Sequence, residues 1–125
     1  EIGVRLVGSE MCIRDRRMKA NGDAILRKMD KLYLQNSNMS YVLSGENPDT
    51  GNARETIFYC WTKQKYDTVE SPVSDFEIDG KTFEVGGRNK GKKQISNLED
   101  AYVVKDTIEY VFDNQVPLWM FGFLY

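Results

Sequence analysis

A short stretch in the second half of the chain has the clearest alternation of polar and apolar residues. The runs 75–78 and 81–85 each alternate over the length of a strand, with apolar side chains separated by acidic or other polar ones. Asp79 and Gly80 stand between them, and an Asp-Gly pair in this setting is a strong signal for a two-residue turn. The pattern therefore predicts two antiparallel strands joined by a tight turn.

Apolar residues at three- and four-residue spacing predict a helix over 52–63, with Ala53, Ile57, Phe58 and Trp61 on its apolar face. Weaker patterns, bounded by Gly, Pro, Asn and Ser, predict shorter elements. The expected order is a helix, three strands, a helix and a strand, which predicts an α/β domain with a mixed sheet. The shorter elements are a weak helix over 18–29, strands at 31–34, 66–70 and 101–104, helices at 37–43, 92–98 and 118–124, and a strand or irregular segment at 107–112.

Composition excludes some function classes. The 125 residues suffice for one modest core, in which we expect Trp61 and Trp119, and 41% hydrophobic and 29% charged residues are ordinary values. The absence of histidine excludes histidine-based triads and most zinc sites. Cys12 and Cys60 suggest no disulfide framework, and no apolar run reaches the roughly 18 residues of a membrane span. We therefore expect a cytoplasmic protein without a membrane partner, and at a net charge of -2 any basic surface must be local.

The first sixteen residues follow neither a helical nor a strand period for long. The string VGSEMCIRDR, at 7–16, resembles the translation of sequencing-adapter read-through that occurs at the ends of unrelated protein sequences. We therefore expect 1–16 to lie outside the fold, 17–30 to be a remnant of an upstream linker, and 31–125 to form the domain. The alternative is a true N-terminal strand over 4–7.

Two acidic residues of the hairpin are candidates for chemistry. Asp75 and Glu84 fall on neighbouring strands, and the tight turn allows both to lie near the same end or on the same face of the sheet. Two converging carboxylates suit Mg²⁺, which prefers oxygen ligands and keeps several waters. The alternative is that both are solvated hairpin positions. Glu55 is a further acid on the predicted helix, where the helix dipole alone would explain it.

A basic, glycine-rich loop follows the hairpin. The spacing of Gly86, Gly91 and Lys92 nearly completes a phosphate-binding P-loop, but Lys93 stands where the motif requires the Ser or Thr that binds magnesium. We therefore expect no ATP binding by this chain. The loop either contacts nucleic-acid phosphates or is a plain solvated turn. The basic residues that would make such contacts are Arg88, Lys90, Lys92 and Lys93.

Six short motifs together resemble one known family. They are KLYLQNSN (31–38), RET (54–56), DF (75–76), FEVGGRNK (83–90), KQI (93–95) and PLWMFGFLY (117–125), of which the last is the most specific. Over roughly residues 23 to 125 the chain resembles the C-terminal domain of a class of prokaryotic AAA-type ATPases. That domain is catalogued as of unknown function and is thought to adopt a restriction-endonuclease-like fold. In the family, a P-loop ATPase domain and a winged-helix-like segment precede it.

The resemblance implies a PD-(D/E)xK-type core of order α-β-β-β-α-β. The family's site has a helix glutamate, a strand aspartate and a Glu-x-Lys motif, which fall on Glu55, Asp75 and Glu84. The lysine position of that motif falls on Gly86. Hydrolysis by this fold uses magnesium, which Asp75 and Glu84 would hold, while the lysine orients the nucleophile and offsets developing charge.

Two main hypotheses remain open on this basis. Without the lysine, the domain is a degenerate, nuclease-like accessory domain of an AAA-type ATPase. It then binds nucleic acid or a partner protein without cutting, and the implied upstream ATPase domain is its partner. Alternatively, it is a magnesium-dependent nuclease in which Arg88 or Lys90 replaces the missing lysine. A third hypothesis, a stand-alone nucleotide binder, rests only on the incomplete P-loop.

Overall fold

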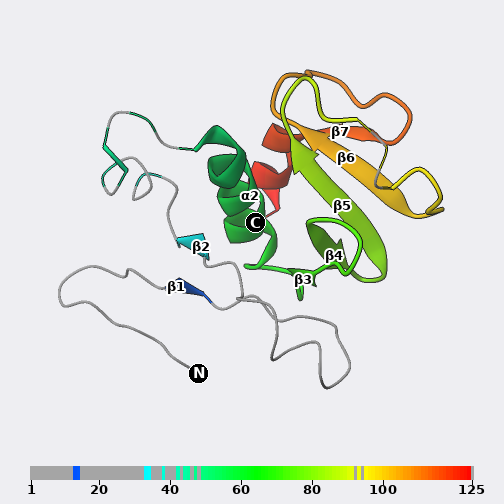
Figure 1. Cartoon of the computed structure of the whole chain (residues 1–125). Coiled ribbons are helices and arrows are strands. Elements are labelled where there is room, and N and C mark those ends of the chain that lie inside the picture. The colour runs from blue at the N-terminus through cyan, green and yellow to red at the C-terminus, as the bar shows by residue number, and fades with distance from the viewer. Residues whose placement is uncertain are drawn as a thin grey trace.

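The computed structural model describes most of the chain from residue 49 onward and a few residues before it. The described residues are 13–14, 33–34, 38, 42, 44–45, 47, 49–91, 93 and 95–124. They form a five-stranded mixed sheet with one long helix beside it, α2 (Thr50–Thr62), so the predicted α/β class and mixed sheet are confirmed (Figure 1). Among the described helices, none is long and apolar enough to cross a membrane.

The sheet combines antiparallel and parallel pairing. Its strands are β3 (Val69–Glu70), β4 (Phe76–Ile78), β5 (Lys81–Gly86), β6 (Ala101–Lys105) and β7 (Gln115–Pro117), and they lie side by side in this order. Pairing is antiparallel from β3 to β5 and parallel from β5 to β7. The arrows of β5 and β6 therefore end at the same edge of the sheet, the upper edge in Figure 1. Ligands commonly bind at this edge of open α/β sheets.

The predicted hairpin between β4 and β5 is confirmed. Its turn residues, Asp79 and Gly80, have φ angles of 49° and 80°. Positive φ at both positions is typical of a type I′ turn, whose twist matches that of the strands. The register pairs Phe76 with Phe83, so these two rings lie on the same face of the sheet.

Helix α2 begins two residues before the predicted start. Its cap is Asp49, which accepts a hydrogen bond of 2.9 Å from the N–H of Gly51. Of the residues predicted on its apolar face, Ala53 and Phe58 are buried, whereas Ile57 and Trp61 are only partly buried at the margin of the core. The buried residues are Ala53, Thr56, Phe58, Tyr59 and Thr62.

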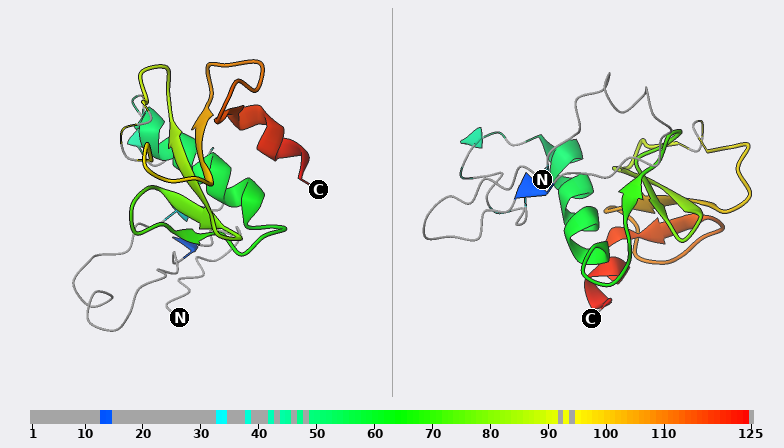
Figure 2. Two further views of the ribbon diagram at one scale, coloured as in Figure 1. Left: turned by 90° about the vertical axis from the view of Figure 1, so that its right-hand side faces the viewer. Right: turned by 90° about the horizontal axis from the view of Figure 1, so that it is seen from below.

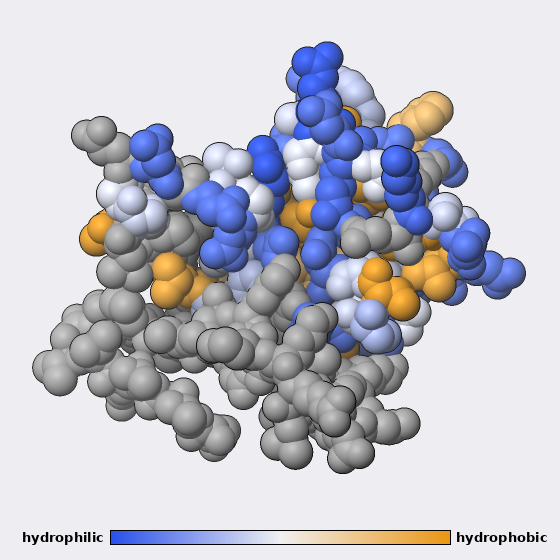
Figure 3. All heavy atoms as spheres, viewed as in Figure 1, coloured by the Kyte–Doolittle hydropathy of each residue, from blue (hydrophilic) through white to orange (hydrophobic). Residues whose placement is uncertain are grey.

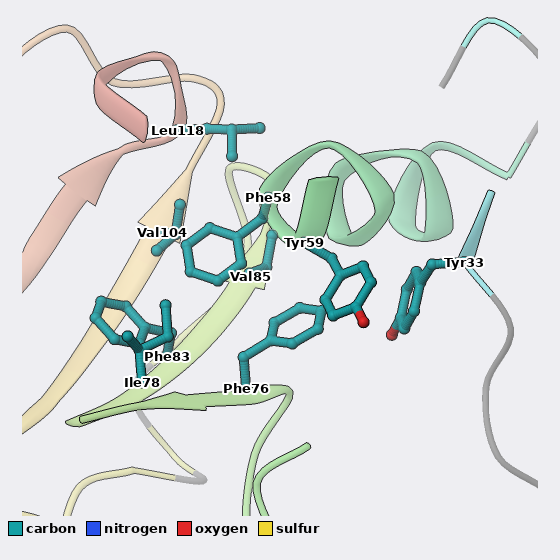
Figure 4. Close-up of a cluster of buried hydrophobic side chains, with 9 residues drawn as sticks. All are labelled: Tyr33, Phe58, Tyr59, Phe76, Ile78, Phe83, Val85, Val104 and Leu118. Carbon is teal, nitrogen blue, oxygen red and sulfur yellow. The ribbon is translucent and has the colours of Figure 1, made fainter. Parts of the chain in front are cut away.

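Aromatic rings fill the space between α2 and the sheet (Figure 4). Phe58 is fully buried, and its ring centroid lies 5.2 Å from that of Phe76 and 5.5 Å from that of Phe83. The ring of Phe121 meets it edge-on at 4.7 Å. Because successive strand residues point to opposite faces, Glu84 points away from this aromatic core.

The opposite face of the sheet carries a smaller apolar cluster, made of Ile95, Ala101 and Val103. The helix predicted over 92–98 is wrong, since the described residues of this segment form turns. Among the described residues of this segment only Ile95 is buried, and Leu98 is 40% exposed, so they do not form the apolar stripe that stabilises a short helix. Among the described residues, the expected α-β-β-β-α-β order therefore lacks its second helix.

Other elements are shorter or more irregular than expected. The strand predicted over 66–70 is reduced to β3, and 107–112 is irregular apart from one bridge between Phe112 and Gln115. Strand β7 was not predicted at all. The strands expected near 75–85 and 101–104 are present within one residue of their predicted ends.

The closing segment forms a 3-10 helix, η2 (Leu118–Phe123), in place of the predicted α-helix. It packs against α2, and both lie on the same face of the sheet (Figure 2). With three residues per turn, Leu118 and Phe121 face inward. Trp119 is 51% exposed and stacks edge-on against exposed Phe123, so its assignment to the core was wrong.

The described residues before Asp49 are scattered. Asn38, Val42 and Ser44 are helical, within or next to the helix predicted over 37–43, and Gly45 follows with a φ of 69°. The rest of that segment and the helix expected over 18–29 lie outside the described residues. Strand β2 (Tyr33–Leu34) falls within the strand predicted at 31–34 and pairs antiparallel with β1 (Ile13–Arg14).

Strand β1 belongs to the segment that we expect to lie outside the fold. Removing residues 1–16 should lower the melting temperature by only a few degrees, because two cross-strand pairs contribute about 0.2–1 kcal/mol each. Thermal unfolding followed by circular dichroism, on the full chain and on a chain starting at Arg17, measures this directly. A drop of more than about 10 °C would show that the segment is part of the fold.

Candidate functional site

The candidate site begins where β4 separates from β5. The pair Phe76–Phe83 is the last one at this end of the hairpin. Beyond it, Asp75 Oδ2 accepts a hydrogen bond of 2.8 Å from the N–H of Val85. A side-chain carboxylate thus replaces a strand carbonyl as the acceptor, and this holds Asp75 beside Glu84, the residue before Val85.

Asp75 and Glu84 face one cation, the ammonium group of Lys90. Its Nζ lies 2.5 Å from Glu84 Oε1 and 3.9 Å from Asp75 Oδ2. The Glu84 side chain is 1% exposed, and the Ser74 hydroxyl donates a hydrogen bond to its other oxygen, Oε2. The two carboxylates that the sequence singled out therefore lie together, around an amine from the loop that follows β5.

The stem of Lys90 occupies the space that a side chain on Gly86 would fill. A Cβ atom on Gly86 would lie 2.5 Å from Cβ and Cγ of Lys90 and 2.7 Å from its Cδ. A turn brings Lys90 back over β5, and the backbone N–H of Lys90 donates a hydrogen bond of 3.0 Å to the carbonyl of Gly87. The amine therefore reaches the carboxylates across the position where the Glu-x-Lys motif would place its lysine.

Glu55, on α2, lies at the edge of this cluster. Its negative charge contributes to the raised pKa values of Asp75 and Lys90, and its Oε2 accepts a hydrogen bond of 2.7 Å from Tyr33 Oη. No three His, Cys, Asp or Glu side chains of the described residues are grouped so that they could hold a metal ion together. The candidate metal ligands in this conformation are thus Asp75 and Glu84 alone.

Burial and like charges act together on the site. Burial raises the pKa of the Asp75 carboxyl, and the charges of Glu55 and Glu84 add to this increase against the opposing effects of the Val85 N–H and Lys90. Burial by itself would lower the pKa of Lys90, but its hydrogen bond to Glu84 and the surrounding negative charges leave that pKa raised. The site therefore favours additional positive charge.

The other basic residues of the loop are placed differently from Lys90. Arg88 and Lys93 are exposed, and Lys92 lies outside the described residues. Hydrophilic residues gather at the upper end of the face seen in Figure 3, where β5 and β6 end. A P-loop requires a helix directly after its glycine-rich turn, and the described residues after Gly91 form turns instead.

Two hydrogen-bond donors of the site were not predicted from the sequence. Ser74 binds Glu84, ten positions further along the chain, and Tyr33 binds Glu55 from a strand before α2. No periodicity or motif marks a serine or tyrosine as the partner of a distant carboxylate. Such pairs become visible only once the strands are placed side by side.

Arg54 is a further neighbour that the sequence left without a role. Its Nε lies 2.5 Å from Asp106 Oδ2, and its guanidinium lies over Gly87, the residue after β5. The only available signal was its place beside Glu55 in the motif RET.

Comparison with known proteins gives no further guidance, since no family model, curated protein or solved structure matches the chain. The fold class and the geometry around Glu84 are thus the observations that bear on function. The structure places acidic groups, a partly exposed amine and a glycine pair at the carboxyl end of β5.

Proposed function

We propose that this chain is a nuclease-like domain that hydrolyses phosphodiester bonds of nucleic acid with the help of magnesium. The observation that carries the proposal is the position of Lys90, whose stem replaces a side chain on Gly86 and whose amine meets Glu84 and Asp75. The missing lysine was the main reason to expect a degenerate site, and the position of Lys90 supports the alternative in which this residue replaces it. The proposed fold is restriction-endonuclease-like, and the proposed partner is an upstream ATPase domain, as in the family that the sequence resembles.

The donor set fits a magnesium ion held by two carboxylates. Asp75 and Glu84 offer hard oxygen ligands, and magnesium is often bound by one or two carboxylates while it keeps several waters. Burial, and after it the charges of Glu55 and Glu84, raise the pKa of Asp75, so a cation bound nearby would favour its ionised form. Bound magnesium would supply polarisation of the phosphodiester and a more acidic water.

The side chains have separate roles in this proposal. Lys90 donates hydrogen bonds to a phosphate oxygen or to the attacking water, and it offsets the charge that develops during hydrolysis. Because its pKa is raised, it stays an ammonium at neutral pH and acts as a donor instead of a base. Ser74 and the Val85 N–H hold Glu84 and Asp75 in the orientation that the ion requires.

A second candidate function is binding of nucleic acid without cleavage. It is favoured by the fact that the described residues offer no group of three metal-binding side chains. It is also favoured by the ammonium of Lys90, which already offsets the charge of Glu84. In that case the amine takes the place of the metal, and the site holds a phosphate group without activating water.

Metal uptake and cleavage distinguish the two candidates. Calorimetric titration with Mg²⁺ or Mn²⁺ should detect one binding site, and plasmid DNA or RNA should be cut with either ion but not with EDTA. Glu84→Gln removes a proposed ligand and should abolish both signals. Glu77→Gln is the matched control, since Glu77 lies on β4 of the same hairpin and pairs with Thr82.

The possible outcomes separate the two candidates from each other and from an artefact. Binding of nucleic acid without metal uptake or cleavage contradicts the nuclease proposal and supports the binding domain. Cleavage that survives Glu84→Gln would show that a contaminating nuclease or another site is responsible. A chain that binds neither metal nor nucleic acid contradicts both candidates.

A further inference from the structure

Arg54 joins the helix to the carboxyl edge of the sheet, next to the site. It directly precedes Glu55 on α2, and its Nε lies 2.5 Å from Asp106 Oδ2. Asp106 follows β6, and the register pairs Gly86 of β5 with Lys105 of β6. The guanidinium is therefore held at the edge where these two parallel strands end.

Two adjacent glycines each lie beneath one basic side chain. A Cβ atom on Gly87 would lie 3.1 Å from Cζ and Nη2 of Arg54 and 3.2 Å from Nη1. These nearly equal distances place the flat face of the guanidinium over Gly87. The stem of Lys90 lies over Gly86 in the same way. Because side chains of successive strand residues alternate, the two cations reach the edge from opposite faces of the sheet.

The contact with Asp106 uses only part of the hydrogen-bonding capacity of Arg54. It engages Nε, while Nη1 and Nη2 have no hydrogen-bond partner in the described part of the chain. The Arg54 side chain is 25% exposed, so solvent and ligands reach it. A guanidinium offers donors in a fixed fork that matches a phosphate, and here its orientation is already set by Asp106 and Gly87.

We propose that Arg54 is a phosphate-binding residue, which holds a backbone phosphate of the nucleic acid beside the one that faces Lys90. This inference rests on the proposed function. Asp106 is then a positioning residue, and Gly87 is the position that must lack a side chain so that the guanidinium lies against the backbone. The alternative for Arg54 is a purely structural ion pair between α2 and the end of β6.

Salt dependence of binding separates the two roles. The probe is a fluorescent 20-base-pair DNA duplex, in EDTA so that no cleavage interferes, with anisotropy measured from low to physiological salt. Arg54→Gln should weaken low-salt binding by about tenfold and reduce the log–log salt slope by about 0.9, the value for one duplex phosphate contact. Lys81→Gln is the matched control, since it removes one exposed charge at the opposite end of β5 and should change affinity less than about twofold.

Two further variants keep the test decisive if Arg54→Gln proves unstable. Arg54→Lys keeps the charge but loses the fork, so it should keep the slope and lose part of the affinity. Asp106→Asn removes the ion pair but leaves the guanidinium, so it should leave the slope unchanged. A structural ion pair predicts instead that Arg54→Gln and Asp106→Asn lower the melting temperature equally and that neither changes the slope.

The result also separates this inference from the proposed function. An unchanged salt slope in Arg54→Gln, in a chain that cuts DNA, overturns the role of Arg54 and leaves the nuclease proposal intact. A reduced slope in a chain that takes up no metal and does not cut overturns the nuclease proposal and supports Arg54 as a phosphate ligand. Absence of any low-salt binding by the natural chain overturns the role of Arg54.

Discussion

Lys90→Ala should lower the rate of phosphodiester cleavage by about 10²–10³-fold, the effect expected for loss of one preorganised donor to developing negative charge. The same change should tighten magnesium binding, because the ammonium no longer competes for Glu84 Oε1. It should also lower stability by about 1–3 kcal/mol, since the buried Glu84 carboxylate loses the ammonium group that offsets its charge. Cleavage kinetics, calorimetry with magnesium and urea unfolding measure the three effects.

Two variants at Gly86 make this prediction specific. Gly86→Ala leaves Lys90 in the sequence but places a Cβ 2.5 Å from its stem, so it should displace the amine and lower cleavage nearly as much as Lys90→Ala. The double change Gly86→Lys with Lys90→Gly places a lysine on β5 at position 86. It also removes the side chain at position 90 that would clash with this lysine. This swap should recover at least about a tenth of the natural rate. Full activity in Gly86→Ala, or a swap no better than Lys90→Ala, would contradict the role given to Lys90.

The hairpin illustrates what local sequence predicts well. Its alternation and its Asp79-Gly80 turn are local signals, and the two positive φ angles match the turn that they predict. Because this register is fixed locally, the proximity of Asp75 and Glu84 could be proposed from sequence alone. The family pattern then added Glu55, whose charge the structure brings into the same neighbourhood.

Features that depend on distant packing were predicted less well. The segment 92–98 was expected to be a helix, yet among its described residues only Ile95 belongs to a buried apolar cluster. The face of α2 was predicted only in part, since Ala53 and Phe58 are buried as expected but the burial of Thr56, Tyr59 and Thr62 was missed. The aromatic core of the sheet, and not only the order of apolar residues within the helix, decides which side chains face inward. Arg88 and Lys90 were both candidates to replace the lysine of the Glu-x-Lys motif. The choice between them depends on which side chain occupies the space above Gly86, and only the folded structure shows that.

Asp75→Asn should raise the stability of the fold at neutral pH while it abolishes metal uptake. Burial and the charges of Glu55 and Glu84 raise the pKa of Asp75, so the ionised carboxylate is disfavoured in the folded state. Asparagine keeps an oxygen that can accept the Val85 N–H but carries no charge. We expect a gain on the order of 1 kcal/mol, as stabilising changes at functional sites commonly give, with at least about a hundredfold loss of cleavage.

The pH dependence of this gain provides an internal check. A raised pKa means that the folded chain binds the Asp75 proton more tightly than the unfolded chain, so this carboxyl adds stability in acid. That contribution is lost as the pH rises from about 3.8, the ordinary value, through the folded-state pKa. The Asp75→Asn variant has no carboxyl group to titrate at this position. Its free energy of unfolding in urea should therefore exceed that of the natural chain most at pH 7, and the difference should shrink toward pH 4. Lower stability of Asp75→Asn at pH 7 would contradict this expectation. It would mean that Lys90 and the Val85 N–H stabilise the Asp75 carboxylate more than burial and the charges of Glu55 and Glu84 destabilise it. The charge of the natural site would then be balanced without a metal.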